Sequence, residues 1–169
     1  MARCLIVGCG CRGLELAAAL RSEGHAVRGT TRDGARRAEI EASGVEPFIG
    51  DPNVVGTLAA ALAHVGVACI LLGSAIGNDE QLAALHGTRL DMLLERMLDT
   101  TVRGVVYQAA GSVGPVLLGA GAERVRYACE RSLIPYEVLT ADPATDAGWV
   151  SQAVGAAERA LLGRDQYAR

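Results

Sequence analysis

The chain has 169 residues, which is enough for one domain, residues 1–169, with a hydrophobic core of its own. Half of the residues are hydrophobic but only 4% are aromatic, a composition typical of helices packed on a parallel sheet. The net charge of −3 and the lack of long basic runs argue against nucleic acid as the main partner. No run of about 20 apolar residues predicts a membrane span, and the first apolar run, 5–7, is too short for a signal peptide.

The cysteines and the basic residues narrow the chemistry further. The five cysteines are scattered and odd in number, which argues against a disulfide framework and predicts a reduced, cytoplasmic protein. The sequence contains no lysine, so all 16 basic residues are arginine. Mechanisms that need a lysine amine, such as Schiff-base formation or a Walker lysine, are therefore excluded.

Strand-like and helix-like segments alternate along the chain. In chain order the patterns predict strand 3–8, helix 14–22, strand 26–31, helix 34–42 capped by Asp33, strand 45–49, helix 53–64, strand 67–72, loop 73–78, helix 79–100 with a break at Gly87, strand 102–110, loop 111–115, helix 116–132, strand 135–140 and helix 145–162. Such alternation favours parallel strands joined by right-handed helical crossovers. We therefore predict a three-layer α/β Rossmann fold with strand order 3-2-1-4-5-6.

A glycine-rich loop, Gly8-Cys9-Gly10-Cys11-Arg12-Gly13, joins the first predicted strand to the first predicted helix. This is the context that the dinucleotide-binding motif Gly-x-Gly-x-x-Gly requires. The first glycine permits a tight turn, the second lets a pyrophosphate approach the backbone, and the third lets helix and strand pack closely. The helix N-terminus would then offer N–H groups to the anion. The expected contacts are Gly8, Gly10, Cys11, Arg12 and Gly13; the alternative is a tight turn that binds nothing.

The two cysteines of this loop raise a second question, since Cys-x-Cys also occurs in metal and redox sites. No neighbouring His or Cys cluster supplies further ligands, so no metal site is predicted and two small filler side chains are the preferred interpretation. Oxidation of a thiol at a helix N-terminus is the alternative. Methyltransferases that use S-adenosylmethionine carry a similar loop, but the six-residue spacing fits a dinucleotide better.

The end of the second strand bears on the choice of dinucleotide. NAD-selective proteins place Asp or Glu there to bind the ribose hydroxyls, whereas this chain has Thr31 followed by Arg32. A guanidinium can grip a 2′-phosphate, so the pair favours NADP, with NAD as the alternative. Asp33 would become the ribose ligand if the strand ended two residues later, but we prefer it as the helix cap.

Several stretches together resemble a known superfamily: LIVGCGCRG, GHAVRGTTR, FIGDP, ACILLGSA, VRGVVYQAAGS and IPYEVLTAD, within residues 3–140. They are similar to the atypical and extended short-chain dehydrogenases/reductases, in particular the NAD-dependent epimerase/dehydratase and NmrA-like NAD(P)-binding proteins. The resemblance implies that Asp51 lies near the adenine, although capping is an equal alternative. It also implies that Leu72, Gly73 and Ser74 lie beside the adenosine ribose.

The sequence departs from that superfamily at its catalytic Ser-Tyr-Lys trio. The expected serines after the fifth strand are replaced, and Ser112 comes one residue late. The lysine is absent, and Tyr127 with Arg131 is a weak substitute because a guanidinium does not simply replace an ammonium. The expected function is an NADP-preferring protein, either an oxidoreductase without the usual trio or a non-catalytic NADP(H)-sensing regulator. The small-molecule substrate is unknown, and loops 73–79, 111–116 and 140–147 would hold it.

The remaining candidates carry less information. His25 is interpreted as structural, and Trp149 as a packing anchor. His86 is interpreted as a helix-surface residue, with the cofactor crevice as the alternative. The apolar stripe on the helix around residues 90–98 mostly covers the sheet, and a homodimer formed through these helices is a further hypothesis.

Overall fold

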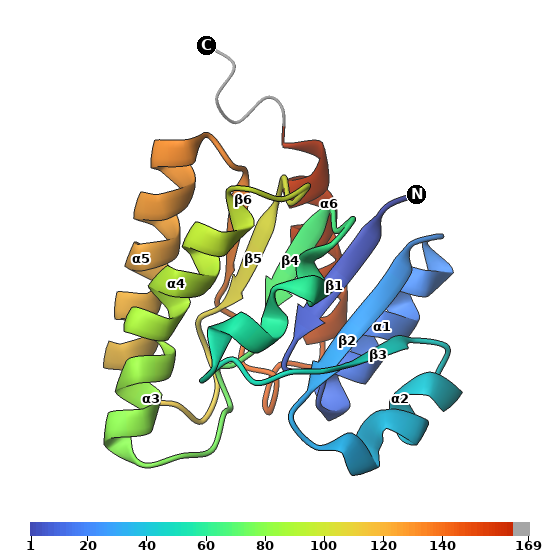
Figure 1. The fold of residues 1–169 in the computed structure, drawn as a ribbon, viewed down its shortest axis with the longest axis horizontal. Coiled ribbons are helices and arrows are strands. Elements are labelled where there is room, and N and C mark those ends of the chain that lie inside the picture. The colour runs from blue at the N-terminus through green and yellow to red at the C-terminus, as the bar shows by residue number, and fades with distance from the viewer. Residues whose placement is uncertain (164–169) are drawn as a thin grey trace.

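The computed structural model describes residues 1–163. Six parallel strands form one sheet in the order β3-β2-β1-β4-β5-β6, which confirms the predicted Rossmann topology (Figure 1). The strands are β1 (Arg3–Val7), β2 (Ala26–Thr31), β3 (Glu46–Ile49), β4 (Val67–Ile70), β5 (Val105–Gln108) and β6 (Tyr136–Leu139). The first two strands pair in the register that sets Cys4 opposite Val27.

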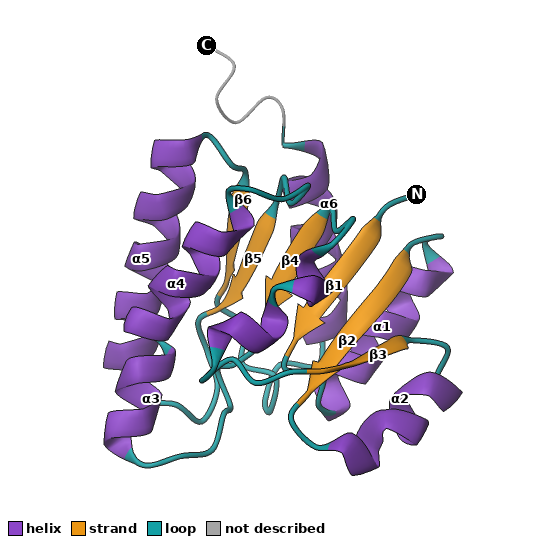
Figure 2. Ribbon diagram, viewed as in Figure 1, coloured by secondary structure: helices purple, strands orange, loops and turns teal. Residues whose placement is uncertain are grey.

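Helices cover both faces of the sheet (Figure 2). They are α1 (Cys11–Ser22), α2 (Arg37–Ala42), α3 (Asp79–Leu85), α4 (Thr88–Met97), α5 (Pro115–Ser132) and α6 (Trp149–Leu162). Helices α1 and α6 lie together on one face, while α4 and α5 lie side by side on the other (Figure 1). No described helix is both long enough and apolar enough to cross a membrane.

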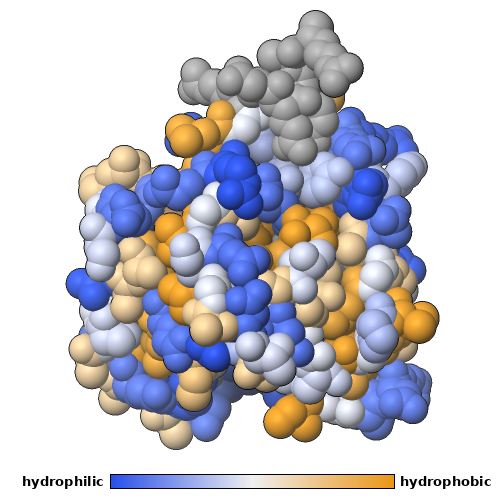
Figure 3. Space-filling view, turned by 180° about the vertical axis from the view of Figure 1, so that it is seen from behind, coloured by the Kyte–Doolittle hydropathy of each residue, from blue (hydrophilic) through white to orange (hydrophobic). Residues whose placement is uncertain are grey.

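The core consists of two clusters, one on each face of the sheet. Along β1 every second side chain points to the same face, so Leu5 and Val7 pack under α4 and α5 while Cys4 and Ile6 pack under α1 and α6. All four side chains are fully buried, as expected for a central parallel strand. The outer face seen in Figure 3 mixes hydrophilic and hydrophobic residues.

The helix predicted at 53–64 is wrong: two 3₁₀ helices, η2 (Val55–Leu58) and η3 (Ala60–Leu62), occupy this segment. Val55, Leu58 and Ala61 are buried, and their spacing of three fits the 3₁₀ period of three residues per turn. The buried guanidinium of Arg28 donates to the carbonyls of Ala61 (2.6 Å) and Ala63 (3.1 Å). This long-range contact ties the end of the segment to β2.

The helix predicted at 79–100 is interrupted at Gly87, as expected, and forms α3 and α4. A Cβ at Gly87 would lie 2.5 Å from the carbonyl oxygen of Ala83, so only glycine fits this close turn. Helix α6 begins at Trp149 rather than at residue 145. The carboxylates of Asp142 and Asp146 accept hydrogen bonds from main-chain N–H groups of this segment and hold it in turns.

Candidate functional site

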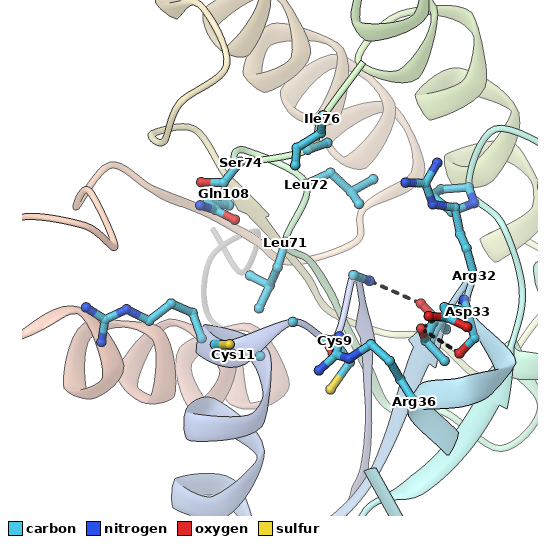
Figure 4. Close-up of a pocket in the computed structure, with 18 of the residues that line it drawn as sticks. Cys9, Cys11, Arg32, Asp33, Arg36, Leu71, Leu72, Ser74, Ile76 and Gln108 are labelled. Atoms are coloured by element: carbon cyan, nitrogen blue, oxygen red, sulfur yellow. Dashed lines mark hydrogen bonds between the residues drawn. The ribbon is translucent and has the colours of Figure 1, made fainter. Parts of the chain in front are cut away.

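A cavity of about 470 Å³ lies at the carboxyl ends of the central strands. This edge of an open parallel sheet is where ligands bind in such folds, and the volume is within the usual range for small-molecule sites. The glycine loop forms one part of the wall, and the segments that follow β2, β4 and β5 form the others (Figure 4).

The glycine loop has the geometry that its sequence predicts. Gly8 has a φ of +86°, and a Cβ there would lie 2.7 Å from the carbonyl oxygen of Leu71. The Gly8 N–H donates to Thr30 Oγ1 at 3.1 Å, which fixes the turn against β2. A Cβ at Gly13 would lie 3.2 Å from the carbonyl oxygen of Gly8, so this glycine permits close packing of α1 on the loop. The turn is therefore built by local sterics.

Gly10 differs from its two neighbours, because a Cβ there would meet no atom within 4 Å. It is the N-cap residue of α1, has no side chain to cap the helix, and is followed by a first turn without acidic residues. The first N–H groups of a helix have no acceptor within the helix. Gly10, Cys11 and Arg12 all line the cavity, so a helix N-terminus with no acidic residue in its first turn borders the cavity. The nearest carboxylate along α1 is that of Glu15, which pairs with Arg12 at 2.7 Å.

The two loop cysteines have different environments. Cys9 is 1% exposed, and its sulfur occupies the space above Gly29, where a Cβ would lie 2.6 Å away. Burial raises the pKa of the Cys9 thiol to about 11, so it stays protonated and acts as a filler. Cys11 is exposed and lines the cavity. No group of three or more His, Cys, Asp or Glu residues suited to a metal occurs among residues 1–163.

The strand β2 ends at Thr31, as predicted, and the residues after it border the cavity. Asp33 caps the following 3₁₀ helix η1 (Gly34–Arg36), because one carboxylate oxygen accepts from the Ala35 N–H at 2.8 Å. The exposed guanidinium of Arg32 has no partner among the described residues. Arg36 donates to the carbonyl of Cys9 at 3.0 Å and so ties this segment to the glycine loop.

Residues suggested by the superfamily resemblance lie at the same edge. Leu72 and Ser74 line the cavity, and Gly73 lies between them without lining it. Asp51 does not line the cavity; its carboxylate accepts from the N–H of Asn53 at 2.9 Å and so stabilises a turn. It does not cap a helix, since the predicted helix 53–64 is absent and η2 has Val54 as its N-cap. The cavity wall is formed there by its neighbours, residues 50, 52 and 53.

The two weak catalytic candidates lie outside the cavity. Tyr127 is 67% exposed on α5, and its hydroxyl accepts from Arg131 at 3.0 Å. Ser112 is exposed in the loop after β5 and is not part of the cavity wall. The structure therefore does not bring Ser112 or Tyr127 to the glycine loop.

The interpretation of His86 as a surface residue is wrong, since the side chain is 2% exposed. Its Nε2 donates to the Leu72 carbonyl at 3.0 Å, which leaves Nδ1 to accept from the Tyr107 hydroxyl at 2.7 Å. Burial lowers the pKa of His86, and the bond to Leu72 partly opposes this shift. The neutral ring thus joins the end of β4 to β5 behind the cavity wall.

Sequence reasoning missed several residues of the cavity wall, among them Asn53, Leu85 and Gln108. Arg36 was weighed as an addition to the phosphate site, and Pro143 lies in the loop 140–147 that was expected to hold substrate. Gln108 could have been found, because a polar residue ending a buried strand at the ligand-binding edge is a recognisable signal. Trp149 is the packing anchor that was expected, at 1% exposure, and also borders the cavity.

Solved structures resemble this fold. A short-chain dehydrogenase/reductase superfamily protein from Agrobacterium tumefaciens with bound NAD shares 19% identity, with 80% of this chain and 48% of that chain covered and a TM-score of 0.65. A triphenylmethane reductase from Citrobacter complexed with NADP(H) shares 21% identity, with 81% of this chain and 48% of that chain covered and a TM-score of 0.64. A UDP-glucuronic acid 4-epimerase from Bacillus cereus in complex with NAD shares 15% identity, with 80% of this chain and 55% of that chain covered and a TM-score of 0.62.

No protein-family model and no curated protein matches the sequence. The chain spans about half the length of these three solved structures. At such low identity the likeness establishes the fold. The chain therefore has the Rossmann fold that these three solved proteins share.

Proposed function

We propose that this protein binds a nicotinamide dinucleotide, NADP in preference to NAD, in the cavity at the carboxyl edge of the sheet. The observation that supports the proposal is that the N-terminus of α1 borders the cavity and is open to an anion. Gly10 leaves the approach open, and no first-turn carboxylate repels an anion. Arg12 lies in the same turn and lines the cavity, with its guanidinium paired to Glu15 at 2.7 Å. A diphosphate would accept from the N–H groups of residues 11–13 and gain from the helix dipole.

The preference for NADP rests on the residues after β2. Arg32 has a guanidinium that no described residue engages, on the wall of the cavity, and such a group binds phosphate in a bidentate manner. Asp33 would be the ribose ligand of an NAD-selective site, but one of its oxygens already caps η1. Arg36 also lines the cavity, but its guanidinium pairs with Glu39 at 3.1 Å and donates to the Cys9 carbonyl. Arg32 is therefore the arginine proposed to bind the 2′-phosphate.

A bound nicotinamide would supply hydride transfer, to which a protein contributes orientation and electrostatics. Neither Ser112 nor Tyr127 borders the cavity, so we propose an oxidoreductase that does not use the usual trio. The same observation favours a second candidate, a non-catalytic regulator that senses NADP(H). Oxidation of NADPH in the presence of a panel of carbonyl compounds would separate the two, because the regulator would bind NADPH without consuming it.

Self-association through α4 and α5 stays a prediction. Leu90, Leu93, Leu94 and Met97 are buried against the sheet, whereas Leu98 is half exposed beside the groove between the two helices. Light scattering of the purified protein would test the dimer.

Calorimetric titration with NADP and NAD tests the proposed function. We expect NADP to bind more tightly than NAD, and Arg32→Ala to weaken NADP about tenfold while leaving NAD unchanged. Arg103→Ala is the matched control, because this exposed arginine lies outside the cavity and its loss changes the net charge equally. Tighter binding of NAD would refute the preference, and failure of both nucleotides to bind would refute the proposal itself.

A further inference from the structure

A buried glutamine holds together two loops of the cavity wall. Gln108 is the last residue of β5, is 4% exposed, and lines the cavity. Its Oε1 accepts from the Gly73 N–H at 3.3 Å, and its Nε2 donates to the Ala110 carbonyl at 2.8 Å. One side-chain amide therefore links the loop after β4 to the loop after β5.

The neighbouring backbone is shaped around this amide. A Cβ at Gly73 would lie 2.9 Å from Cδ of Gln108 and 2.7 Å from the Ala110 carbonyl oxygen. A Cβ at Gly111 would clash with the carbonyl oxygen of Gly73. That oxygen accepts from the N–H of Val113 at 2.9 Å, which adds a backbone link between the loops. The Gln108 carboxamide thus lies against Gly73, where a side chain would collide with it, and Gly111 lets the two loops approach each other.

The amide retains unused hydrogen-bonding capacity. A glutamine carboxamide has two donor hydrogens and two acceptor lone pairs. Contacts within residues 1–163 engage one hydrogen and one lone pair of Gln108. A group suited to the remainder both donates and accepts a hydrogen bond. Ribose hydroxyls and a primary carboxamide have this chemistry, and the nicotinamide nucleoside carries both.

The charges on the cavity wall decide which half of a dinucleotide reaches Gln108. Arg32 and Asp33 lie on one side of the cavity, whereas Gln108 and Ser74 lie together on another (Figure 4). A 2′-phosphate on the adenosine half would bind near Arg32. With the diphosphate at the start of α1, the nicotinamide half then extends toward β5.

We propose that Gln108 binds and positions the nicotinamide nucleoside of the dinucleotide. This inference rests on the proposed function, since it assumes that the cavity takes NADP. The role assigned to Gln108 follows from the contacts and the unused hydrogen-bonding groups of this side chain.

Binding of three ligands tests the assignment by calorimetry: NADP, 2′-phospho-ADP-ribose and 2′,5′-ADP. Gln108→Ala should weaken NADP about tenfold and leave 2′,5′-ADP within twofold, because 2′,5′-ADP has no second nucleoside. If Gln108→Ala also weakens 2′-phospho-ADP-ribose, Gln108 contacts the ribose hydroxyls of the nicotinamide nucleoside. If 2′-phospho-ADP-ribose binds the variant as it binds the wild type, Gln108 contacts the nicotinamide carboxamide. Gln152→Ala is the control, since this exposed glutamine on α6 lies outside the cavity.

A second variant, Gln108→Glu, keeps the test possible if Gln108→Ala does not fold. Its measured quantity is the ratio of the affinities for NADP⁺ and NADPH, which a purely structural role of Gln108 would not change. Gln108→Glu is nearly isosteric and still accepts from Gly73, and in its protonated form it still donates to the Ala110 carbonyl. Titration over pH 6–9 compares the protonated with the ionised acid. The ionised acid loses the donor to Ala110, and its carboxylate would attract the cationic ring of NADP⁺ but not the neutral ring of NADPH. We expect the ratio of the two affinities to shift about tenfold toward NADP⁺.

Either of two results with the variants would overturn the assignment: an unchanged ratio in Gln108→Glu, or equal weakening of all three ligands in Gln108→Ala. Equal affinity of the wild type for NADP and 2′,5′-ADP would also overturn it while leaving the proposed function in place. Failure of the wild type to bind any of the three would instead refute the proposed function.

Discussion

Replacing Gly10 by valine should remove dinucleotide binding without harming the fold. Gly10 has φ −80° and ψ −161°, which any L-residue can adopt, and a Cβ there meets nothing within 4 Å. A side chain restricts the unfolded chain, which stabilises the fold by about 0.4–1 kcal/mol, but valine is a poorer N-cap residue than glycine by a similar amount. The two effects oppose each other, so the free energy of unfolding should change by no more than about 1 kcal/mol.

The expected loss of affinity is much larger than this change in stability. The added methyl groups would stand where a diphosphate must approach the N-terminus of α1. Two hydrogen bonds to a charged group contribute about 1.5–3 kcal/mol each, and each 1.4 kcal/mol is about a factor of ten in affinity. We therefore expect Gly10→Val to weaken NADP by at least about 100-fold.

Calorimetry for binding and thermal unfolding for stability would be measured on the same samples. Gly8→Ala is the contrasting variant, because Gly8 has a φ of +86° and its Cβ would lie 2.7 Å from a carbonyl oxygen. It should lower the stability by about 1–3 kcal/mol. If Gly10→Val kept wild-type affinity for NADP, the diphosphate would not bind at this helix and the reasoning would fail.

Three further predictions concern stability. Asp33→Ala removes the cap on η1 and should lower the free energy of unfolding by about 1 kcal/mol in urea titrations, whereas Asp33→Asn should keep most of it. Because burial lowers the pKa of His86, the unfolded chain takes up a proton below about pH 6.5 that the folded chain resists, so stability should fall with falling pH by up to about 1.4 kcal/mol per pH unit. His86→Leu should remove this part of the pH dependence, and an identical profile in both proteins would contradict it. Gly121→Ala would drive a Cβ into the Tyr107 hydroxyl and should cost about 1–3 kcal/mol, whereas Gly119→Ala in the same helix has open space and should not destabilise the protein.

The sequence predicts the parts of the molecule that depend on local patterns. The alternation of strands and helices gives the sheet order, and the break at Gly87 follows from one residue type. The geometry of the glycine loop is also local, since Gly8 and Gly13 act within a few residues of each other. These features need no knowledge of distant contacts.

The missed features depend on contacts between distant parts of the chain. Residues 53–64 have good helix formers, but Arg28 of β2 reaches their carbonyls, and the burial pattern has a period of three. His86 directly follows the short helix α3, and its partners are the Leu72 carbonyl in the loop after β4 and Tyr107 of β5. The hydrogen bonds of Gln108 to Gly73 and Ala110 require the loops after β4 and β5 to lie side by side. The sequence of either loop alone does not reveal this arrangement.

A crystal structure of the protein grown with NADP would test the central claim most directly. We predict electron density for a diphosphate within hydrogen-bonding distance of the main-chain N–H groups that begin α1, with the 2′-phosphate beside Arg32. A nucleotide bound elsewhere, or an empty cavity at saturating NADP, would contradict it.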